Sequence, residues 1–483
     1  FKQKTAYEIR LSLVGSEMCI RDSNTYTGPT AVNEGTLRIA TANERIPNGS
    51  AVTLADTVGA VLDLNDFDET VSSLSGGGAA GGNVLLGTGT LTTGNAGNQT
   101  YAGVISDGGG LTKIGGGIFT LTGTNTYTGA TTLTAGTLLV NGSLAAGSAV
   151  GVAAGTTLGG NGTVAGAITV TGAAFVSPGA SSGATAILNT GGVTLNTDAE
   201  IIVELNNTTA GTGHDRIAVT GTIDLNDVNL SGTVGAGVTL GNAFTIITAT
   251  AVNGLINGVT DGSTLVLDGR LFTVNYTATT VILTRSAGTF TWTGTASGSW
   301  INPLNWNQGL AIPGQGDSLI FPGTAVSNID AMTNDLLGSP TFVNITFNGD
   351  GGYTLGGSAV AFSGTLTGSS TTGTNAIDVA LNGAGAVIIN GVGGTTAFNG
   401  ANGYTGATTI TNGTLVAGNA TALGTTAGGT TLNPAAGTAV LQINGVSIGA
   451  EALTFNSGGG TATLENLVGT TTYAGPVTLT TAG

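Results

Sequence analysis

The chain has 483 residues, of which 86 are glycine and only 7% are charged, and its formal net charge is −16. Four of its ten lysine and arginine residues lie within residues 1–23, so no basic stripe remains for a nucleic acid and we expect no such partner. The single cysteine, Cys19, excludes an internal disulfide, and no apolar run approaches the ~18–20 residues of a membrane-crossing helix.

The apolar residues occur in short runs of Val, Leu, Ile and Ala, which Gly, Asn, Asp and Thr separate. A helical period of 3.6 residues cannot develop in such runs, so we expect almost no helix. The glycine has no triplet period, which excludes collagen. The composition therefore predicts many short buried strands that tight corners connect.

Residues 1–23 differ in composition from everything that follows. Glu17 interrupts the one apolar stretch that a signal peptide would need. The segment resembles the translation of a sequencing-library adaptor, and we interpret it as a non-native leader and exclude it from fold reasoning; the alternative is a genuine leader or linker. We also expect a fragment of a longer protein, since the chain starts inside a repeat and stops at "VTLTTAG".

Three near-copies of one sequence follow: "NTYTGPTAVNEGTLRIA" from residue 24, "NTYTGATTLTAGTLLV" from 125 and "NGYTGATTITNGTLVA" from 402. Each copy has a tyrosine, a glycine two residues later and a second glycine seven residues after the first. The equivalent positions are Tyr26, Gly28 and Gly35; Tyr127, Gly129 and Gly136; and Tyr404, Gly406 and Gly413. The pattern predicts a strand, a corner that needs positive φ, and a second strand. Such units bury their apolar faces only by stacking as coils.

Residues 101–142, "YAGVISDGGGLTKIGGGIFTLTGTNTYTGATTLTAGTLLVNG", resemble the autotransporter-associated β-strand repeat, and similar stretches cover most of residues 24–483. This resemblance implies an all-β, right-handed parallel β-helix on, or released from, the surface of a Gram-negative-type bacterium. It implies attachment to the outer membrane through a part that this chain lacks. It implies no particular ligand; surface glycans or proteins of a host or the environment are the partners that such a location offers.

Changes in composition and in expected strand length along the chain predict two tandem arrays with a cap-like β unit between them. We assign residues 24–199 to β-helix repeats and 200–285, with longer strands, to a closing unit of the first array. Residues 286–349 start a second unit, and residues 350–483 resume the repeats.

Trp292, Trp300 and Trp306 are the only tryptophans and lie within the start of that second unit. One interpretation is an aromatic platform on which sugar rings stack. The other, which we favour, is a plug that fills the end of the second array with bulky side chains.

Other motifs indicate structure more strongly than chemistry. "GASSG" places Ser181 in a G-x-S-x-G pattern, but no helix is expected there and His214 is the only histidine. His214, Asp215 and Arg216 suggest a loop hydrogen bond or a turn cap. Lys113 follows glycines without a phosphate-loop order, which predicts a solvated corner residue.

Four carboxylates cluster in "LDLNDFDET" and could suggest a weak calcium site, although the spacing matches no calcium-loop pattern. A strand, corner and strand is the favoured interpretation. The carboxylates are Asp63, Asp66, Asp68 and Glu69.

The sequence thus predicts a non-enzymatic surface or secreted adhesin stalk or structural spacer, with no cofactor and no metal. Glycan binding through the tryptophan unit is the alternative. A polysaccharide-processing β-helix enzyme is disfavoured, because only six lysine and arginine residues follow residue 23 and they are dispersed. They are Arg38, Arg45, Lys113, Arg216, Arg270 and Arg285.

Overall fold

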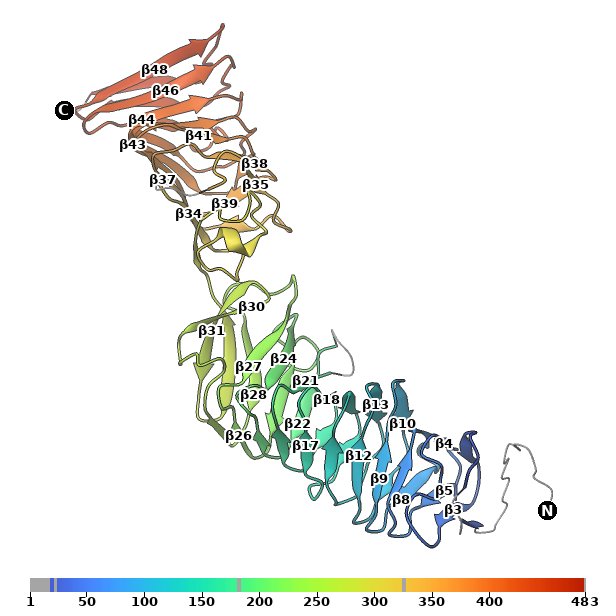
Figure 1. Cartoon of the computed structure of the whole chain (residues 1–483). Coiled ribbons are helices and arrows are strands. Elements are labelled where there is room, and N and C mark those ends of the chain that lie inside the picture. Colours follow the sequence, from blue (N-terminus) through green and yellow to red (C-terminus); the bar gives the residue numbers. More distant parts are fainter. Residues whose placement is uncertain (1–17, 21–23, 180–183, 324–326, 482–483) are drawn as a thin grey trace. The chain divides into compact units, whose positions relative to one another are not determined.

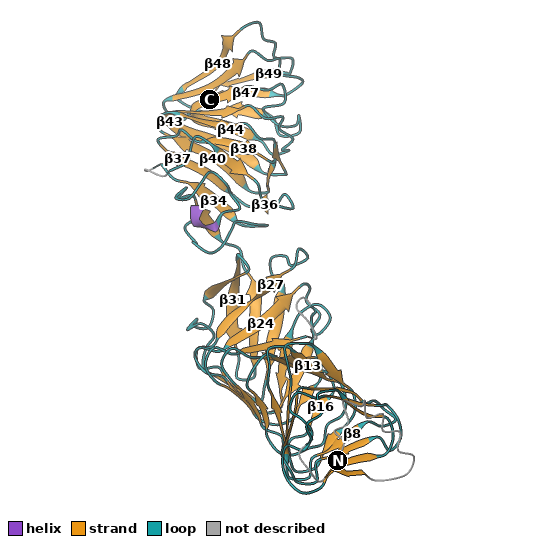
Figure 2. Ribbon diagram, turned by 45° about the vertical axis from the view of Figure 1, so that its right-hand side comes forward, coloured by secondary structure: helices purple, strands orange, loops and turns teal. Residues whose placement is uncertain are grey.

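The structure is a computed structural model that describes residues 18–20, 24–179, 184–323 and 327–481. The chain divides into two compact units. Unit 1 comprises Phe1–Asp268 and Phe272–Thr284, and unit 2 comprises Gly269–Leu271 and Arg285–Gly483. Within each unit, consecutive coils of the chain lie side by side, and almost every element is a strand (Figures 1 and 2).

In the described part of unit 1, the strands form four sheets that run across successive coils. The first is ten-stranded, in the order β2 (Thr30–Val32), β4 (Ala51–Leu54), β7 (Ser73–Gly76), β10 (Gln99–Tyr101), β13 (Ile118–Leu121), β15 (Thr137–Val140), β18 (Thr157–Gly160), β21 (Phe175–Pro178), β24 (Glu200–Leu205) and β27 (Asn229–Val234). The second is five-stranded, in the order β1 (Met18–Ile20), β3 (Thr36–Ile39), β5 (Val61–Asp63), β8 (Asn83–Leu85) and β11 (Ile105–Ser106).

The third sheet is nine-stranded, in the order β29 (Ala251–Asn253), β26 (Thr222–Asp224), β23 (Val193–Thr194), β20 (Ile168–Val170), β17 (Val150–Val152), β14 (Thr131–Leu133), β12 (Gly110–Lys113), β9 (Thr90–Thr93) and β6 (Glu69–Val71). The fourth is eight-stranded, in the order β16 (Ser143–Leu144), β19 (Thr163–Val164), β22 (Ile187–Thr190), β25 (Arg216–Val219), β28 (Ala243–Thr248), β32 (Thr280–Arg285), β31 (Arg270–Tyr276) and β30 (Thr264–Leu267). Strands β28 and β32 pair antiparallel.

In the described part of unit 2, most strands belong to one branched, fourteen-stranded sheet. Its main path is β33 (Thr289–Thr291), β34 (Ser318–Phe321), β37 (Ile345–Gly349), β40 (Thr365–Ser370), β43 (Ala386–Phe398), β44 (Thr408–Ala417), β45 (Thr430–Leu432), β47 (Leu453–Ser457) and β49 (Val477–Thr481). The branches are β35 (Met332–Asn334), β38 (Thr354–Gly357), β41 (Thr374–Ile377), β46 (Thr438–Asn444) and β48 (Thr461–Val468). A second, three-stranded sheet contains β36 (Thr341–Phe342), β39 (Val360–Phe362) and β42 (Leu381–Asn382).

The core of unit 1 is a set of columns in which equivalent apolar residues of successive coils stack. Along the ten-stranded sheet one column is in parallel register throughout, and each member is at most 7% exposed: Phe119, Leu138, Leu158, Val176, Ile201 and Leu230. On the outer face of the nine-stranded sheet, threonines stack instead: Thr92, Thr112 and Thr132. Because side chains alternate along a strand, one register places apolar residues inside and threonines outside in every coil.

The predicted all-β parallel solenoid is confirmed. Among the described residues, the helical structure is one turn of 3-10 helix, η1 (Pro303–Asn305), and none of it has the length and apolarity that a membrane crossing requires. Part of the excluded leader is also in the fold, since β1 pairs in parallel with β3 from Met18 to Ile20. Unpaired backbone groups at the edge of a sheet accept such a strand.

Candidate functional site

The repeat tyrosines link neighbouring coils through hydroxyl groups. Tyr127 is fully buried, and its hydroxyl lies 2.6 Å from the Thr131 hydroxyl. The Thr131 hydroxyl lies 2.8 Å from that of Ser148 on the next coil. Burial raises the pKa of Tyr127 to about 12, so the hydroxyl stays neutral. This position therefore holds the corner by polar contacts within the core.

The other two copies repeat the contact. The hydroxyls of Tyr26 and Thr30 lie 2.6 Å apart, and Thr30 continues to Ser50 at 2.8 Å. The hydroxyls of Tyr404 and Thr408 lie 2.7 Å apart. The same residue spacing thus gives the same tyrosine–threonine contact in both units, and in unit 1 the threonine continues it to a serine of the next coil.

The second glycine of each copy has a left-handed backbone. The φ angles of Gly35, Gly136 and Gly413 are 69°, 71° and 79°. A Cβ on Gly136 would also lie 2.5 Å from the carbonyl oxygens of Gly115 and Gly117. Side chains of L-amino acids rarely adopt this φ, and here the preceding coil leaves no room for one.

The first glycine has a different role, which depends on the coil before it. A Cβ on Gly129 would lie 2.3 Å from the Gly109 carbonyl oxygen, and one on Gly406 would lie 2.2 Å from that of Gly385. A Cβ on Gly28 would meet nothing within 4 Å. Close approach of successive backbones therefore requires glycine at the two inner copies only.

The three tryptophans are buried, with exposed fractions of 0% for Trp292 and Trp300 and 1% for Trp306. Trp306 lies edge-to-face with Trp292 at 5.1 Å and with Trp300 at 5.7 Å between ring centroids. The Trp306 indole N–H donates to the Trp300 carbonyl oxygen at 2.9 Å. The indoles thus present no flat face to solvent, which contradicts the interpretation as a sugar-stacking platform.

Phenylalanines continue this aromatic cluster into the next coils of unit 2. Phe321, in β34, lies within 6.4 Å of all three indoles and stacks on Phe347, in β37, at 4.6 Å. Edge-to-face and offset contacts of this kind stabilise a core beyond the area they bury. The tryptophans therefore fill the interior of the first coils of unit 2.

The clustered carboxylates serve backbone amides and hydroxyls of neighbouring coils. Asp66 accepts from the Thr88 amide at 2.8 Å, and Asp68 accepts from the Thr90 amide at 2.7 Å. Asp63 lies 3.3 Å from the Arg38 guanidinium. No group of three or more potential metal-ligating side chains occurs in the described ranges.

Glu69 is the buried member of this group, with 0% exposure. Its two oxygens accept from the amides of Arg45 at 2.9 Å and Ile46 at 2.8 Å. Burial raises the pKa of Glu69 to about 7, against the lowering effect of these two hydrogen bonds. The carboxyl group therefore ties one coil to the preceding one.

Lys113 is buried, and the prediction of a solvated corner residue is wrong. Only 1% of it is exposed, and its Nζ donates to the carbonyl oxygens of Ile114, Gly115 and Ala135 at 2.8, 2.7 and 3.1 Å. Burial lowers the pKa of the ammonium group. The glycine-rich corner turns these carbonyls toward one point, where the ammonium group satisfies them.

His214 and Asp215 fix the loop that joins β24 to β25. The His214 Nδ1 lies 3.1 Å from the Asn207 carbonyl oxygen, and the ring lies edge-to-face with Phe244 at 5.4 Å. Asp215 accepts from the amides of Ala186 at 2.7 Å and Glu204 at 2.9 Å. The His214 contact is a hydrogen bond within the loop, as the sequence suggests, whereas Asp215 binds amides that lie 29 and 11 residues earlier in the chain and does not cap its own turn.

Burial shifts the pKa values of both residues. Burial lowers the pKa of His214, so the imidazole is favoured in its neutral form. Burial and a side-chain hydrogen bond with Glu204 raise the pKa of Asp215 to about 8. Arg216 follows on the outer face of β25. Ser181, the other residue of the candidate nucleophile motif, lies outside the described residues.

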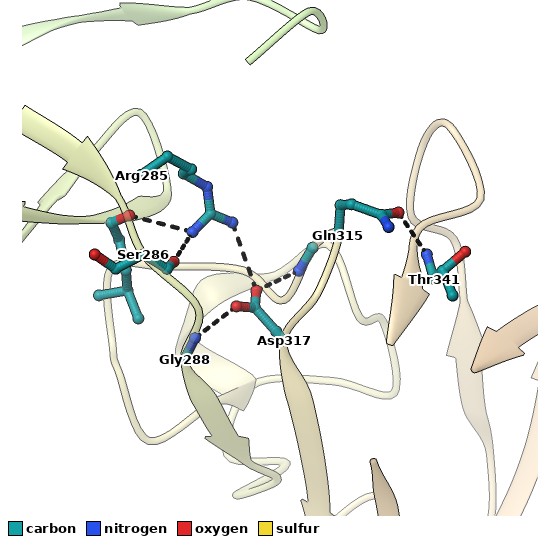
Figure 3. Close-up of polar contacts among 8 residues, drawn as sticks. Arg285, Ser286, Gly288, Gln315, Asp317 and Thr341 are labelled. Carbon is teal, nitrogen blue, oxygen red and sulfur yellow. Dashed lines mark hydrogen bonds and ion pairs between the residues drawn. The ribbon is translucent and has the colours of Figure 1, made fainter. Parts of the chain in front are cut away.

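A buried ion pair in unit 2 was missed by the sequence analysis, which treated Arg285 as one of several dispersed cations. Arg285 is 5% exposed and Asp317 is 0% exposed, with 3.7 Å between Nη2 and Oδ2 (Figure 3). Asp317 also accepts from the amides of Gly288 at 2.6 Å and Gly314 at 2.7 Å. Burial lowers the pKa of Arg285 and raises that of Asp317.

The other donors of Arg285 are also used. Its Nη1 donates to the carbonyl oxygens of Leu271, at 3.1 Å, and Ser286. Beside this pair, the Gln315 side chain accepts from the Thr341 amide at 2.8 Å (Figure 3). The pair thus organises loops at the start of unit 2. Its two members are far apart in the chain, so no local sequence pattern could have predicted it.

The fold and these positions define a class: a parallel β-solenoid of repeated coils whose recurring tyrosines, glycines and buried polar side chains contact the coils' own interior and corners. Three segments of the chain, 22–39, 111–140 and 393–417, match the passenger-associated transport repeat. They contain the tyrosine and both glycines of each of the three copies, so the resemblance to autotransporter repeats is confirmed.

One relative extends this similarity. The adhesin BmaC autotransporter of Brucella suis biovar 1 (strain 1330) is 44% identical to the chain over 108 residues. The aligned part is 22% of this chain and 3% of that protein. The chain is therefore a passenger-like β-solenoid repeat protein with partial homology to an autotransporter adhesin.

Proposed function

We propose that the chain is part of a surface-exposed or secreted bacterial passenger and acts as a non-enzymatic adhesin stalk or spacer. The observation that carries this proposal is the unbroken parallel register of ten strands along unit 1, from β2 to β27. Nine steps of ~4.8 Å make this sheet roughly 43 Å long. The repeat matches and the partial homology to an adhesin support the assignment to a passenger.

The use of the polar side chains supports a structural role. Lys113, Glu69 and Asp215 are buried, and each binds backbone groups of its surroundings. Such contacts stabilise coils and provide stiffness. The partners of this passenger are surface glycans or proteins of a host or the environment, and its location is extracellular or at the bacterial surface.

The experiment removes whole coils. Leu111, Thr131, Val150 and Ile168 occupy equivalent register positions, so deleting residues 111–167 removes three coils and keeps every side chain on its face. Spin labels at the outward positions Thr53 in β4 and Ser231 in β27, in a Cys19→Ser background, report the length of unit 1. We expect the distance between labels to fall from ~38 Å to ~24 Å by double electron–electron resonance.

Deleting residues 111–168 is the matched control. It is one residue longer, so in the strand at the junction Thr169 takes the buried place of Leu111 and Val170 takes the outer place of Thr112, and we expect a lower melting temperature than that of the in-register deletion. If the in-register deletion unfolds, the coils are not interchangeable spacer elements and the proposal fails. Release of reducing ends from an acidic or neutral polysaccharide by the full chain would instead favour the enzyme alternative.

A further inference from the structure

A polar surface pocket of about 410 Å³, largely open to solvent and called the cavity below, lies on the outer surface of unit 1. Its floor includes Ile187 and Asn189 of β22 and Arg216 of β25, which are neighbours in the eight-stranded sheet. One side is the loop before β25, with Gly211 and Thr212. This volume is within the range of small-molecule sites.

The loop beside the cavity is held in one conformation by its own hydrogen bonds. The Gly211 amide donates to the His214 carbonyl oxygen at 2.7 Å, and the Gly213 amide donates to that of Thr209 at 2.8 Å. The buried His214 ring anchors the end of the loop, as described above. Asp215 holds the amide of Ala186, which also lines the cavity. The cavity is therefore preformed, which lowers the entropy lost when a ligand binds.

Arg216 gives the cavity its charge. The Arg216 side chain makes no hydrogen bond or ion pair with the described residues, and its Nε is buried without a partner there. None of the residues that line the cavity is acidic, although the chain has 26 aspartate and glutamate residues. A guanidinium without a partner among the described residues favours a planar anion, which its parallel N–H groups bind in bidentate fashion.

The remaining polar side chains of the cavity can bind the hydroxyl groups of a sugar. The side chains of Asn161 and Thr212 line the cavity and make no hydrogen bond to described residues, and Asn189 donates to the Gly162 carbonyl oxygen at 3.3 Å. Amide and hydroxyl side chains both donate and accept, as sugar hydroxyls do. The Ile187 side chain supplies an apolar surface for the C–H face of a ring.

We propose that this cavity binds an acidic saccharide unit, with its carboxylate on Arg216 and its hydroxyls on Asn161, Asn189 and Thr212. The proposal does not rest on the stalk function, since a spacer without this site would have the same coils. It also differs from the tryptophan platform, because the two sites belong to different units and chemistries.

Titration of the full-length chain with D-glucuronate by ligand-observed saturation-transfer NMR tests the site. We expect saturable binding that Arg216→Gln weakens about tenfold, and that Arg216→Lys weakens less because the charge remains without the planar fork. Arg270→Gln is the matched control, since Arg270 does not line the cavity, and it should bind as the parent does. A melting curve for each variant checks folding, and Asn161→Ala, at the cavity rim, provides a second variant with a weaker but measurable loss.

Each outcome of this titration either supports or overturns the proposal. Absence of saturable glucuronate binding, or equal binding by Arg216→Gln, overturns the proposal. Equal binding of D-glucose overturns the acidic class, because the carboxylate would then contribute nothing. Equal binding of acetate or sulfate identifies a simple anion site and overturns the saccharide assignment. A loss of binding in Arg216→Gln with unchanged coil spacing in the spin-label experiment would separate this site from the spacer role.

Discussion

The Nζ of Lys113 donates to the carbonyl oxygen of Ala135, which lies one coil further along the chain, at 3.1 Å. Two more carbonyl oxygens complete its surroundings, so the lysine joins a corner to the corner that follows it. Replacing it by methionine keeps the stem and removes the donor. We expect Lys113→Met to lower the free energy of unfolding by about 2–3 kcal/mol, because buried carbonyls lose their partner.

Arg38→Met is the control for this substitution. The Arg38 side chain is 40% exposed and pairs with Asp63 at 3.3 Å, and exposed pairs of this kind contribute about 0–1 kcal/mol. Urea unfolding of both variants makes the comparison. Equal stability losses would contradict the special role of the buried ammonium group.

Glu69 makes unit 1 less stable as the pH rises. Burial raises its pKa from 4.5 to about 7, so the folded chain binds more protons than the unfolded chain between these values. Stability is therefore fully present below pH 4.5 and decreases as the pH rises to about 7, by at most about 3 kcal/mol. Calorimetric melting at pH 5 and pH 8 should show a lower Tm at pH 8. This difference should shrink in Glu69→Gln and persist in Glu34→Gln, which changes an exposed corner carboxylate.

The corner glycines can be separated by matched substitutions. Gly136→Ala adds a Cβ at φ 71° and against two carbonyl oxygens, so we expect a loss of at least about 1–3 kcal/mol. Gly28→Ala meets nothing within 4 Å and should change stability by less than about 0.5 kcal/mol. Chemical denaturation of the two variants checks the order. A stable Gly136→Ala protein would show that the corner relaxes.

The two members of the buried Arg285–Asp317 pair differ in how much stability their removal costs. Asp317→Ala leaves the Arg285 charge unpaired and also removes the acceptor of the Gly288 and Gly314 amides. We expect a loss of about 3–5 kcal/mol, larger than that of Arg285→Ala, in which those two hydrogen bonds remain. Thermal unfolding that follows tryptophan emission reports on unit 2, since all three tryptophans lie there. Equal losses would indicate that the charge pair alone matters.

Burial of the tryptophans has a direct optical test. Acrylamide should quench the emission of the folded chain far less than that of the chain in guanidinium chloride, because the indoles are at most 1% exposed. Free N-acetyltryptophanamide calibrates full access. Quenching of the folded chain near the level of the unfolded chain would overturn the buried cluster.

The repeating strands and corners could be predicted because they depend on residues close in sequence. Alternating apolar residues and the glycine spacing sufficed for the all-β solenoid. The polar contacts between coils could not be predicted in this way: Asp66 binds Thr88 and Lys113 binds Ala135, each 22 residues away. Such partners depend on the register between coils, which varies from one coil to the next. Arg285 and Asp317 are farther apart in sequence than either of these pairs.

The parallel ladders have a mechanical consequence. Their hydrogen bonds run from coil to coil, so tension applied along the stack would open them in succession rather than all together. Each detached coil of about 20 residues would add up to ~70 Å to the length of the chain. A cell tethered through this chain in flowing liquid could then move away in steps while the remaining coils stay folded.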